Sequence, residues 1–203
     1  MQKLKSIKLY FFSIIKLFSI SLKNYYFSSN FYNKKLVTFI PDRIFYKPST
    51  YLASSLTSVT QDFYKITNTN PQSLWKIKKI NKLDFNNLHN FLWLTNLNRK
   101  NSKEVTQKII KSWIDKFFNY DAQTWEMEIV AKRIIAWVSN VEITLEDSDQ
   151  IYKENFLICL LKQSNFLSKN INSISYDHTK IMCCSAIILS GLIFKENNCM
   201  DIQ

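Results

Sequence analysis

Apolar side chains recur every three or four residues through most of the second half of the chain. This spacing is typical of helices that bury one face. From Asp84 onward it predicts five helices, whose apolar lines are Phe85 to Leu97, Val105 to Phe118, Val130 to Val141, Phe156 to Ile171, and the series Ile181, Cys184, Ile188 and Leu192. Because short polar turns separate these segments, we expect antiparallel helical hairpins.

Polar residues indicate where these helices begin. Asn101 followed by Glu104 fits a capping box, in which each side chain binds the backbone N–H of the other residue. Thr124 lies just before Glu126, and residues 146–149 are mostly acidic. Negative charge in the first turn of a helix is favoured by the helix dipole, so both places are predicted helix starts.

The first 29 residues carry a similar apolar period. The positions on one helical face are Leu4, Ile7, Phe11, Ile14, Phe18, Leu22 and Tyr25, and Lys5, Lys16 and Lys23 fall largely off it. We therefore predict a basic amphipathic helix over residues 1–29. Three roles stay open: packing on the domain, lying on an anionic membrane surface, or serving as an atypical or uncleaved signal sequence. Lys16 interrupts the apolar run, which is too short to span a bilayer.

Residues 30–83 have no sustained helical period and hold all three prolines. Ser49 or Thr50 is placed to cap a short helix through Val59, and residues 74–83 are interpreted as a short extended piece with a basic rim. The predicted organisation is an amphipathic helix over 1–29, an irregular connection over 30–83, a helical domain over 84–195 and a polar tail over 196–203.

Glycine is almost absent, with one glycine and three prolines among 203 residues. Primed hairpin turns and phosphate-binding loops depend on glycine. We therefore exclude β-sandwiches, β-barrels and glycine-rich nucleotide-binding folds. The predicted fold class is all-α, and no cofactor is expected.

Positive charge is concentrated at the start of the chain. The formal net charge is +11, and seven lysines with no arginine precede the first acid, Asp42. Lysine, asparagine and isoleucine are abundant throughout, so part of this basicity reflects an AT-biased genome. The lysines of residues 76–82 most simply form a solvated face, with attraction of a polyanion as the alternative. Because nothing resembles a base-reading element, no sequence-specific nucleic-acid binding is expected.

Cysteine and histidine show no metal-ligand pattern. The cysteines are Cys159, Cys183, Cys184 and Cys199, without a CxxC spacing, and the histidines, His89 and His178, lie far apart in the sequence. We predict buried free thiols and no metal site. Unpaired cysteines and the lack of a convincing signal peptide favour the cytoplasm over the periplasm without fixing the compartment.

Three motifs follow one another in the helical region. They are Leu88-His89-Asn90-Phe91-Leu92-Trp93-Leu94, then Trp113-Ile114, then Trp125 with Ala131-Lys132-Arg133-Ile134-Ile135-Ala136-Trp137. In order and spacing they resemble the N-terminal helical region of bacterial heparinase II/III-like proteins. Ile40-Pro41-Asp42-Arg43 and residues 185–192 also fit that layout, so the resemblance covers most of the chain from about residue 30.

The resemblance implies part of an (α/α) toroid and a family activity of β-elimination on uronate-containing polysaccharides. The family's catalytic groups lie in later toroid helices and toward a β-sandwich domain, and no position here matches one. We therefore expect a truncated N-terminal fragment that is not catalytic alone, with an acidic polysaccharide or a separately encoded C-terminal half as partner. The alternative is a basic helical module that binds an anionic membrane surface through residues 1–29, or nucleic acid.

Four residues are candidates for substrate binding: His89, Trp93, Trp125 and Arg133. His89 beside Trp93 would stack on a sugar and hydrogen-bond to it, and Arg133 would pair with a uronate. The structural alternatives are a packing role for His89, a salt bridge from Arg133 to Glu126 or Glu128, and a core role for the tryptophans.

Overall fold

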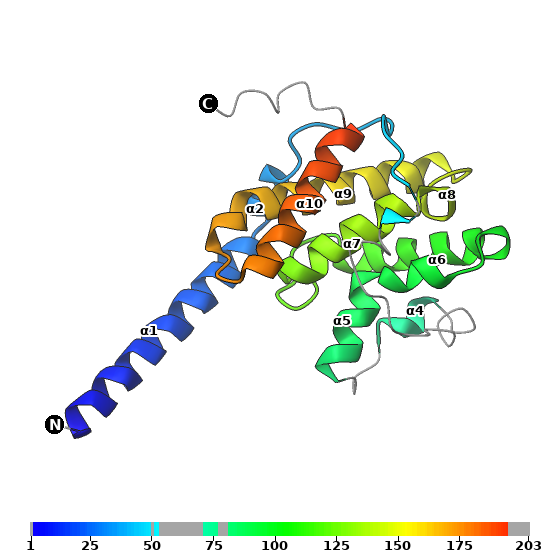
Figure 1. Cartoon of the computed structure of the whole chain (residues 1–203). Helices are drawn as coiled ribbons and strands as arrows, with labels where there is room; N and C mark the ends of the chain where they lie inside the picture. Colours follow the sequence, from blue (N-terminus) through cyan, green and yellow to red (C-terminus); the bar gives the residue numbers. More distant parts are fainter. Residues whose placement is uncertain (1, 50, 53–70, 77–80, 195–203) are drawn as a thin grey trace.

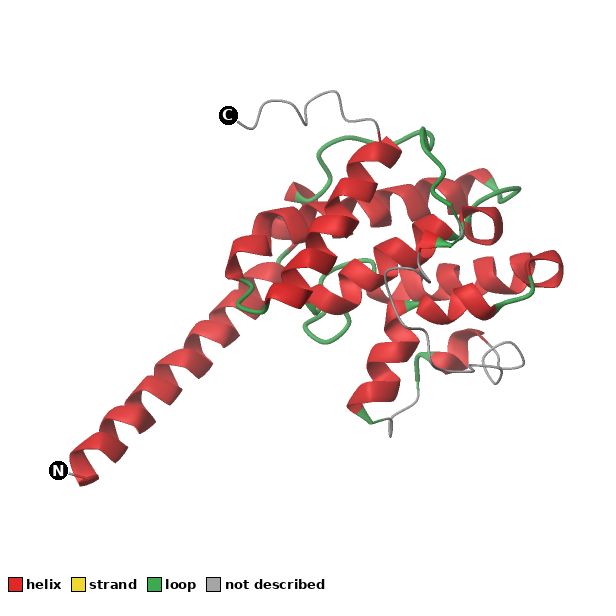
Figure 2. Cartoon of the chain, viewed as in Figure 1, coloured by secondary structure: helices red, strands yellow, loops and turns green. Residues whose placement is uncertain are grey.

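The computed structural model describes residues 2–49, 51, 52, 71–76 and 81–194. All secondary structure within these residues is helical, which confirms the predicted all-α class (Figure 2). The helices are α1 (Gln2–Ser28), α2 (Asn30–Lys35), α4 (Pro71–Leu74), α5 (Lys82–Asn90), η1 (Leu92–Asn96), α6 (Arg99–Phe117), α7 (Met127–Ser139), α8 (Val141–Thr144), α9 (Gln150–Asn170), η2 (Ile171–Ser173) and α10 (Asp177–Phe194).

Helix α7 is the centre of the helical body. It packs against α5 and η1 on one side and against α9 and α10 on another, while α6 packs against α4, α8 and α9. Its apolar side chains are almost entirely buried, because every side of the helix has a neighbour. Helix α1 differs from all of these, since most of its length projects away from the body (Figure 1).

Side-chain caps lie close to the predicted helix starts but not at every one of them. Asn98 caps α6 through its side-chain oxygen, so Asn101 lies inside the helix and the predicted capping box is wrong. Asp149 caps α9, as its acidic segment indicated. Before α7, Asp121 accepts hydrogen bonds from the backbone N–H and hydroxyl of Thr124, and the helix itself begins later, at Met127.

Sharp reversals without glycine use other residues in the left-handed region. Phe91 has φ 59° and Asp147 has φ 56°. A left-handed conformation costs a non-glycine residue roughly 1–2 kcal/mol. The Phe91 side chain is fully buried between Trp93, Trp113 and Trp137, which offsets that cost. This reversal divides the single helix predicted from Phe85 to Leu97 into α5 and η1.

Helix α10 exposes the apolar line that the sequence pattern assigned to it. Ile181 is 65% exposed, Ile188 is 64% exposed and Leu192 is 51% exposed. The buried residues of the helix are Met182, Cys183, Ala186, Leu189, Ser190, Ile193 and Phe194. Because α10 is apolar on nearly all sides, the period alone did not distinguish its core face from its outer face.

Among the described residues, α10 is the one helix with the length and apolar composition to cross a membrane. In the structure 39% of it is buried, and it packs against α7 and α9. A core helix has the same properties, so composition is weak evidence for a membrane span here.

Two predictions for residues 30–83 need correction. Asn30–Lys35 forms the helix α2, which the sequence pattern did not indicate. The predicted extended piece begins instead with the end of α4 at Leu74 and a turn at Trp75 and Lys76. Of the helix predicted through Val59, only the residues up to Leu52 can be assessed, and there the Leu52 N–H donates to the Ser49 carbonyl. The remaining residues of both segments lie largely outside the described part of the chain.

Candidate functional site

The apolar side chains of α1 are exposed over more than half of the helix. Phe11 is 63% exposed, Leu17 is 67% exposed and Phe18 is 65% exposed. Other large apolar residues from Tyr10 to Tyr26 are also exposed, namely Tyr10, Phe12, Ile14, Ile15, Ile20, Leu22, Tyr25 and Tyr26. The predicted alternative in which this helix packs on the domain is therefore wrong for these side chains.

Ser13 and the lysines of α1 whose side chains are described lie on one side of the helix. With 3.6 residues per turn, Ser13, Lys16 and Lys23 follow one another at spacings that keep them on a single stripe, while Phe11 and Phe18 lie opposite. No ion pair to Lys16 or Lys23 is found within the described residues. The helix thus combines a broad apolar face with a narrow, unneutralised basic stripe.

An aromatic cluster joins the C-terminal end of α1 to the body. The Phe27 ring stacks on Tyr32 at 4.6 Å between centroids and meets the edges of Tyr120 at 5.1 Å and Phe166 at 5.7 Å. These partners come from α2, the α6–α7 loop and α9. Phe27 is 7% exposed, so it is a true core residue, unlike its neighbours earlier in the helix.

Buried Asn33 adds polar contacts at this junction between the C-terminal end of α1 and the body, which we call the joint. Its Nδ2 donates to the carbonyl oxygens of Phe27 at 3.0 Å and Ser29 at 2.9 Å, and its Oδ1 accepts from the Tyr120 N–H at 3.0 Å. The Tyr120 hydroxyl donates to Asn24 Oδ1 at 2.9 Å. These bonds fix the last turn of α1 against the body, because several donors and acceptors must be satisfied together.

The second notable site is a buried arginine in the body. Arg133 is 0% exposed, and its Nε donates to Gln163 Oε1 at 2.7 Å. Its Nη1 donates to the carbonyl oxygens of His89 and Thr124, each at 3.0 Å. The guanidinium carbon lies 4.1 Å from the Trp113 ring centroid, a cation–π contact. No acid pairs with it within the described residues, so the predicted salt bridge to Glu126 or Glu128 is wrong.

Arg133 supports the turns on both sides of it. The His89 carbonyl belongs to the last turn of α5, where cations are favoured by the helix dipole. The Thr124 carbonyl belongs to the loop before α7. Burial lowers the pKa of Arg133 to about 9, so it stays protonated at neutral pH, while its Nη2 has no partner among the described residues.

His89 is held uncharged beside this arginine. Its Nδ1 accepts from Trp113 Nε1 at 3.0 Å, so the ring proton lies on Nε2. Burial, together with the positive charges of Arg133 and Lys116, lowers the pKa of His89 to about 3. A neutral imidazole is therefore the form present at physiological pH, and it serves here as a hydrogen-bond acceptor for Trp113.

Helix α9 contributes two more buried polar side chains, Lys162 and Gln163, to the interior of the body. Lys162 is 1% exposed, and its Nζ donates to the Phe118 carbonyl at 2.9 Å and to Asn119 Oδ1 at 2.7 Å. Burial lowers the pKa of Lys162 to about 8. Gln163 donates to Cys159 Sγ at 3.2 Å, and burial raises the pKa of that thiol to about 11. These contacts form a hydrogen-bonded network rather than an ion-paired one.

The four predicted substrate-binding residues are all buried. The exposed fractions are 3% for His89, 3% for Trp93, 1% for Trp125 and 0% for Arg133. His89 and Arg133 are brought together, but His89 contacts the rings of Trp75, Phe85 and Phe117, and no ring contact joins it to Trp93. Trp93 donates to the Leu88 carbonyl and Trp125 to the Phe117 carbonyl. A role in substrate binding stays a prediction for all four.

A pocket of about 210 Å³ lies beside His89. Its polar lining consists of His89, Lys116, Asp121, Gln123 and Thr124, and its apolar lining of Leu74, Trp75, Phe85, Leu88 and Phe117. The Lys116 ammonium donates to the Trp75 carbonyl, and Asp121 Oδ1 accepts from three groups of its own loop. The sequence pattern missed this pocket because its lining comes from three separate segments.

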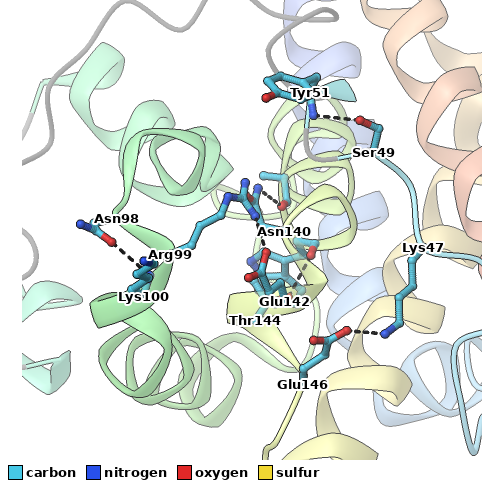
Figure 3. Close-up of polar contacts among 12 residues, drawn as sticks. Lys47, Ser49, Tyr51, Asn98, Arg99, Lys100, Asn140, Glu142, Thr144 and Glu146 are labelled. Atoms are coloured by element: carbon cyan, nitrogen blue, oxygen red, sulfur yellow. Dashed lines mark hydrogen bonds and ion pairs between the residues drawn. The ribbon is translucent and has the colours of Figure 1, made fainter.

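Charged side chains on the body surface are used to tie segments together (Figure 3). Arg99 at the start of α6 donates to Asn140 Oδ1 at 3.0 Å and to Glu142 at 3.3 Å, which joins α6 to α8. Lys47 pairs with Glu146 and so holds the 36–49 loop to the α8–α9 turn. These charges have partners within the body, in contrast to those of α1.

The cysteines and histidines do not assemble into a metal site. No group of three possible His, Cys, Asp or Glu ligands is present within the residues that the structure describes. Cys159 and Cys183 are buried free thiols, as predicted, whereas Cys184 is exposed, contrary to that prediction. Cys199 lies outside the described residues.

Comparison of the chain with protein-family models, with curated proteins and with solved structures finds no match. The resemblance to heparinase II/III-like proteins therefore rests on the sequence motifs alone.

Proposed function

We propose that this protein is a helical domain that binds the surface of an anionic membrane through α1. The observation that carries the proposal is the exposure of large apolar side chains, among them Phe11, Leu17 and Phe18, on a helix whose Lys16 and Lys23 form no ion pair with any described residue. Exposed apolar patches of this kind mark sites of contact with a partner or a lipid surface. A helix with an apolar face and basic flanks is typical of interfacial membrane binding.

The expected free energies of side-chain insertion support membrane binding by α1. Burying a phenylalanine or leucine side chain yields roughly 1.5–3 kcal/mol, and each lysine near an anionic surface adds about 1 kcal/mol. Three inserted side chains at about 2 kcal/mol each, together with Lys16 and Lys23, supply about 8 kcal/mol, which corresponds to micromolar association.

Nucleic acid is the less suitable anionic partner. Phosphate-backbone binding requires a surface dominated by cations. The described part of α1 is dominated instead by exposed aromatic and aliphatic side chains, with Lys16 and Lys23 as its charged groups. A lipid surface accommodates both kinds of side chain at once.

Co-sedimentation with vesicles tests the proposal. The full chain should bind vesicles containing phosphatidylglycerol and bind phosphatidylcholine vesicles several-fold more weakly, with the difference reduced at high salt. A duplex DNA of random sequence serves as the competing polyanion. Failure to bind either vesicle, or equal binding to DNA and to anionic vesicles, would contradict the proposal.

We further propose, as a second candidate, that the helical body is a non-catalytic domain of the heparinase II/III-like kind that contacts an acidic polysaccharide. It is supported by the clustering of the motif residues, since His89, Trp113 and Arg133 come from three motifs and contact one another. The toroid arrangement of the hairpins is part of this proposal.

Incubation with heparin and with alginate tests the second candidate. We expect retention of the chain on the immobilised glycan without release of unsaturated uronate products. Release of such products would contradict the absence of catalysis, and lack of retention on both glycans would contradict the polysaccharide partner.

A further inference from the structure

The joint between α1 and the body shares a side with the basic stripe of α1. Phe27, which contacts the body, follows Lys23 by four residues, and Lys23 follows Lys16 by seven. Residues at these spacings lie on one side of a helix. The body is therefore attached on the side of α1 that carries the lysines.

A line of exposed apolar side chains runs along the opposite side of α1. Phe11, Phe18 and Tyr25 are spaced by seven residues, and Phe18 is two positions from Lys16, or about 200° around the helix axis. Tyr25 is 80% exposed although it lies within three residues of the buried Phe27. The apolar face thus stays uncovered as far as the joint itself.

From this register we infer how the proposed membrane contact is oriented, an inference that rests on the proposed function. Helix α1 lies in the plane of an anionic bilayer with Phe11, Phe18 and Tyr25 toward the acyl chains. Lys16 and Lys23 extend toward the phosphate groups, and the joint holds the body on the aqueous side. The partner is the bilayer surface itself.

The length of α1 and the charge of Lys16 fit a helix in the plane of the membrane better than a helix that spans it. A helix of 27 residues is about 40 Å long at 1.5 Å per residue, but a perpendicular α1 would carry Lys16 into the hydrocarbon core. In the plane of the membrane, a lysine stem covers apolar surface while its ammonium reaches water and phosphate. The Lys23 ammonium lies 5.3 Å from the centroid of the Phe27 ring. From this position it can reach phosphate groups while it keeps its contact with Phe27.

The contacts of the joint fix where the body lies relative to the bilayer. Asn33 binds α1 and the α6–α7 loop at once, and Phe27 contacts rings from three other segments. Rotation at this joint is restricted, because it would break the hydrogen bonds of Asn33 and Tyr120 together. Membrane binding through α1 therefore gives the body a fixed side relative to the bilayer.

Depth-dependent fluorescence quenching tests this orientation. A fluorophore is attached at one cysteine in each of three chains: Phe18→Cys, Lys16→Cys, and a chain that keeps its exposed native Cys184. Cys199 is replaced by serine in all three, Cys184 is replaced by serine in the first two, and buried Cys159 and Cys183 are retained. The vesicles contain phosphatidylglycerol and lipids with a nitroxide quencher on the acyl chain.

We expect quenching at position 18 at least three-fold greater than at positions 16 and 184. Equal quenching at 16 and 18 would contradict the in-plane register, and strong quenching at 184 would show that the α10 face enters the bilayer instead. Co-sedimentation of the chain labelled at Cys184, which keeps Lys16 and Phe18, separates the two proposals. Its failure to bind the vesicles refutes the proposed function, whereas bound protein with the wrong quenching pattern refutes the orientation alone. Self-association without vesicle binding would identify a second copy as the occupant and refute both.

Discussion

Helix α1 exposes apolar side chains, whereas the helical body buries charged ones. In α1, Phe11 and Phe18 face solvent, whereas in the body Arg133 and Lys162 are buried. Exposure of apolar groups has a cost in water that a partner removes. Burial of cations has a cost that hydrogen bonds to carbonyl and amide oxygens offset. The proposed membrane contact of α1 accounts for this contrast, because it would remove the cost of exposing its apolar side chains.

The largest expected effect in the body is that of removing Arg133. Arg133→Ala leaves the carbonyl oxygens of His89 and Thr124 and the Gln163 amide without a donor, so we expect the free energy of unfolding to fall by about 3–5 kcal/mol. Urea unfolding measures this. Lys132→Ala is the matched control, since within the described residues the Lys132 ammonium makes an i,i+4 pair with Glu128, and its loss should cost about 0.5 kcal/mol. Equal losses in the two variants would contradict a stabilising role for the buried hydrogen bonds of Arg133.

On the α1 side, the sharpest change replaces two exposed phenylalanines. Phe11→Ser with Phe18→Ser should weaken binding to phosphatidylglycerol vesicles about 100-fold, since each ring contributes about tenfold. Unfolding of the body should be unchanged, because neither ring contacts it. Phe31→Ser is the control, as Phe31 is 69% exposed but lies on α2. If the control weakens binding as much as the double variant, the contact is not specific to α1.

The neutral state of His89 predicts how stability depends on pH. The pKa of His89 is about 3 in the folded protein, against about 6.5 in the unfolded chain, so the unfolded chain binds the extra proton between these values. The free energy of unfolding should therefore fall by about 1.4 kcal/mol per pH unit as pH drops from 6 to 4. His89→Gln should remove this part of the slope, while His178→Gln, an exposed control, should retain it. Superimposable profiles for wild type and His89→Gln would contradict the assignment.

Surface ion pairs of the body should have the smallest effect. Lys47→Ala removes the pair with Glu146 that links the 36–49 loop to the α8–α9 turn, and we expect a loss below about 1 kcal/mol in thermal or urea unfolding. A loss above about 2 kcal/mol would mean that the loop depends on this pair for its position.

The two regions also differ in how far the sequence predicted them. The helix over residues 1–29 and the helices after residue 84 followed from their apolar periods, and the all-α class followed from the near absence of glycine. The period did not show that most of α1 is left exposed by the described part of the chain, since an amphipathic face has the same sequence pattern whether protein, lipid or water covers it.

The inside of the body was harder to predict for a different reason. Arg133 and His89 were identified from the sequence, but Gln163 and the Thr124 carbonyl that complete their contacts come from distant segments. Backbone carbonyls carry no sequence signature, so the sequence suggested an acidic partner for Arg133 instead. The split between α5 and η1 was missed because Phe91 takes a left-handed conformation that is rare for a bulky residue.

Amide hydrogen exchange on the full chain, with and without phosphatidylglycerol vesicles, tests the central claim most directly. Helix α1 makes few contacts beyond its joint, so its amides should exchange rapidly in solution and slow at least tenfold from Tyr10 to Tyr25 on the vesicles. The amides of α7 and α9 should be unchanged. Unchanged exchange in α1, or new protection confined to the body, would contradict the assignment of α1 as the membrane-binding helix.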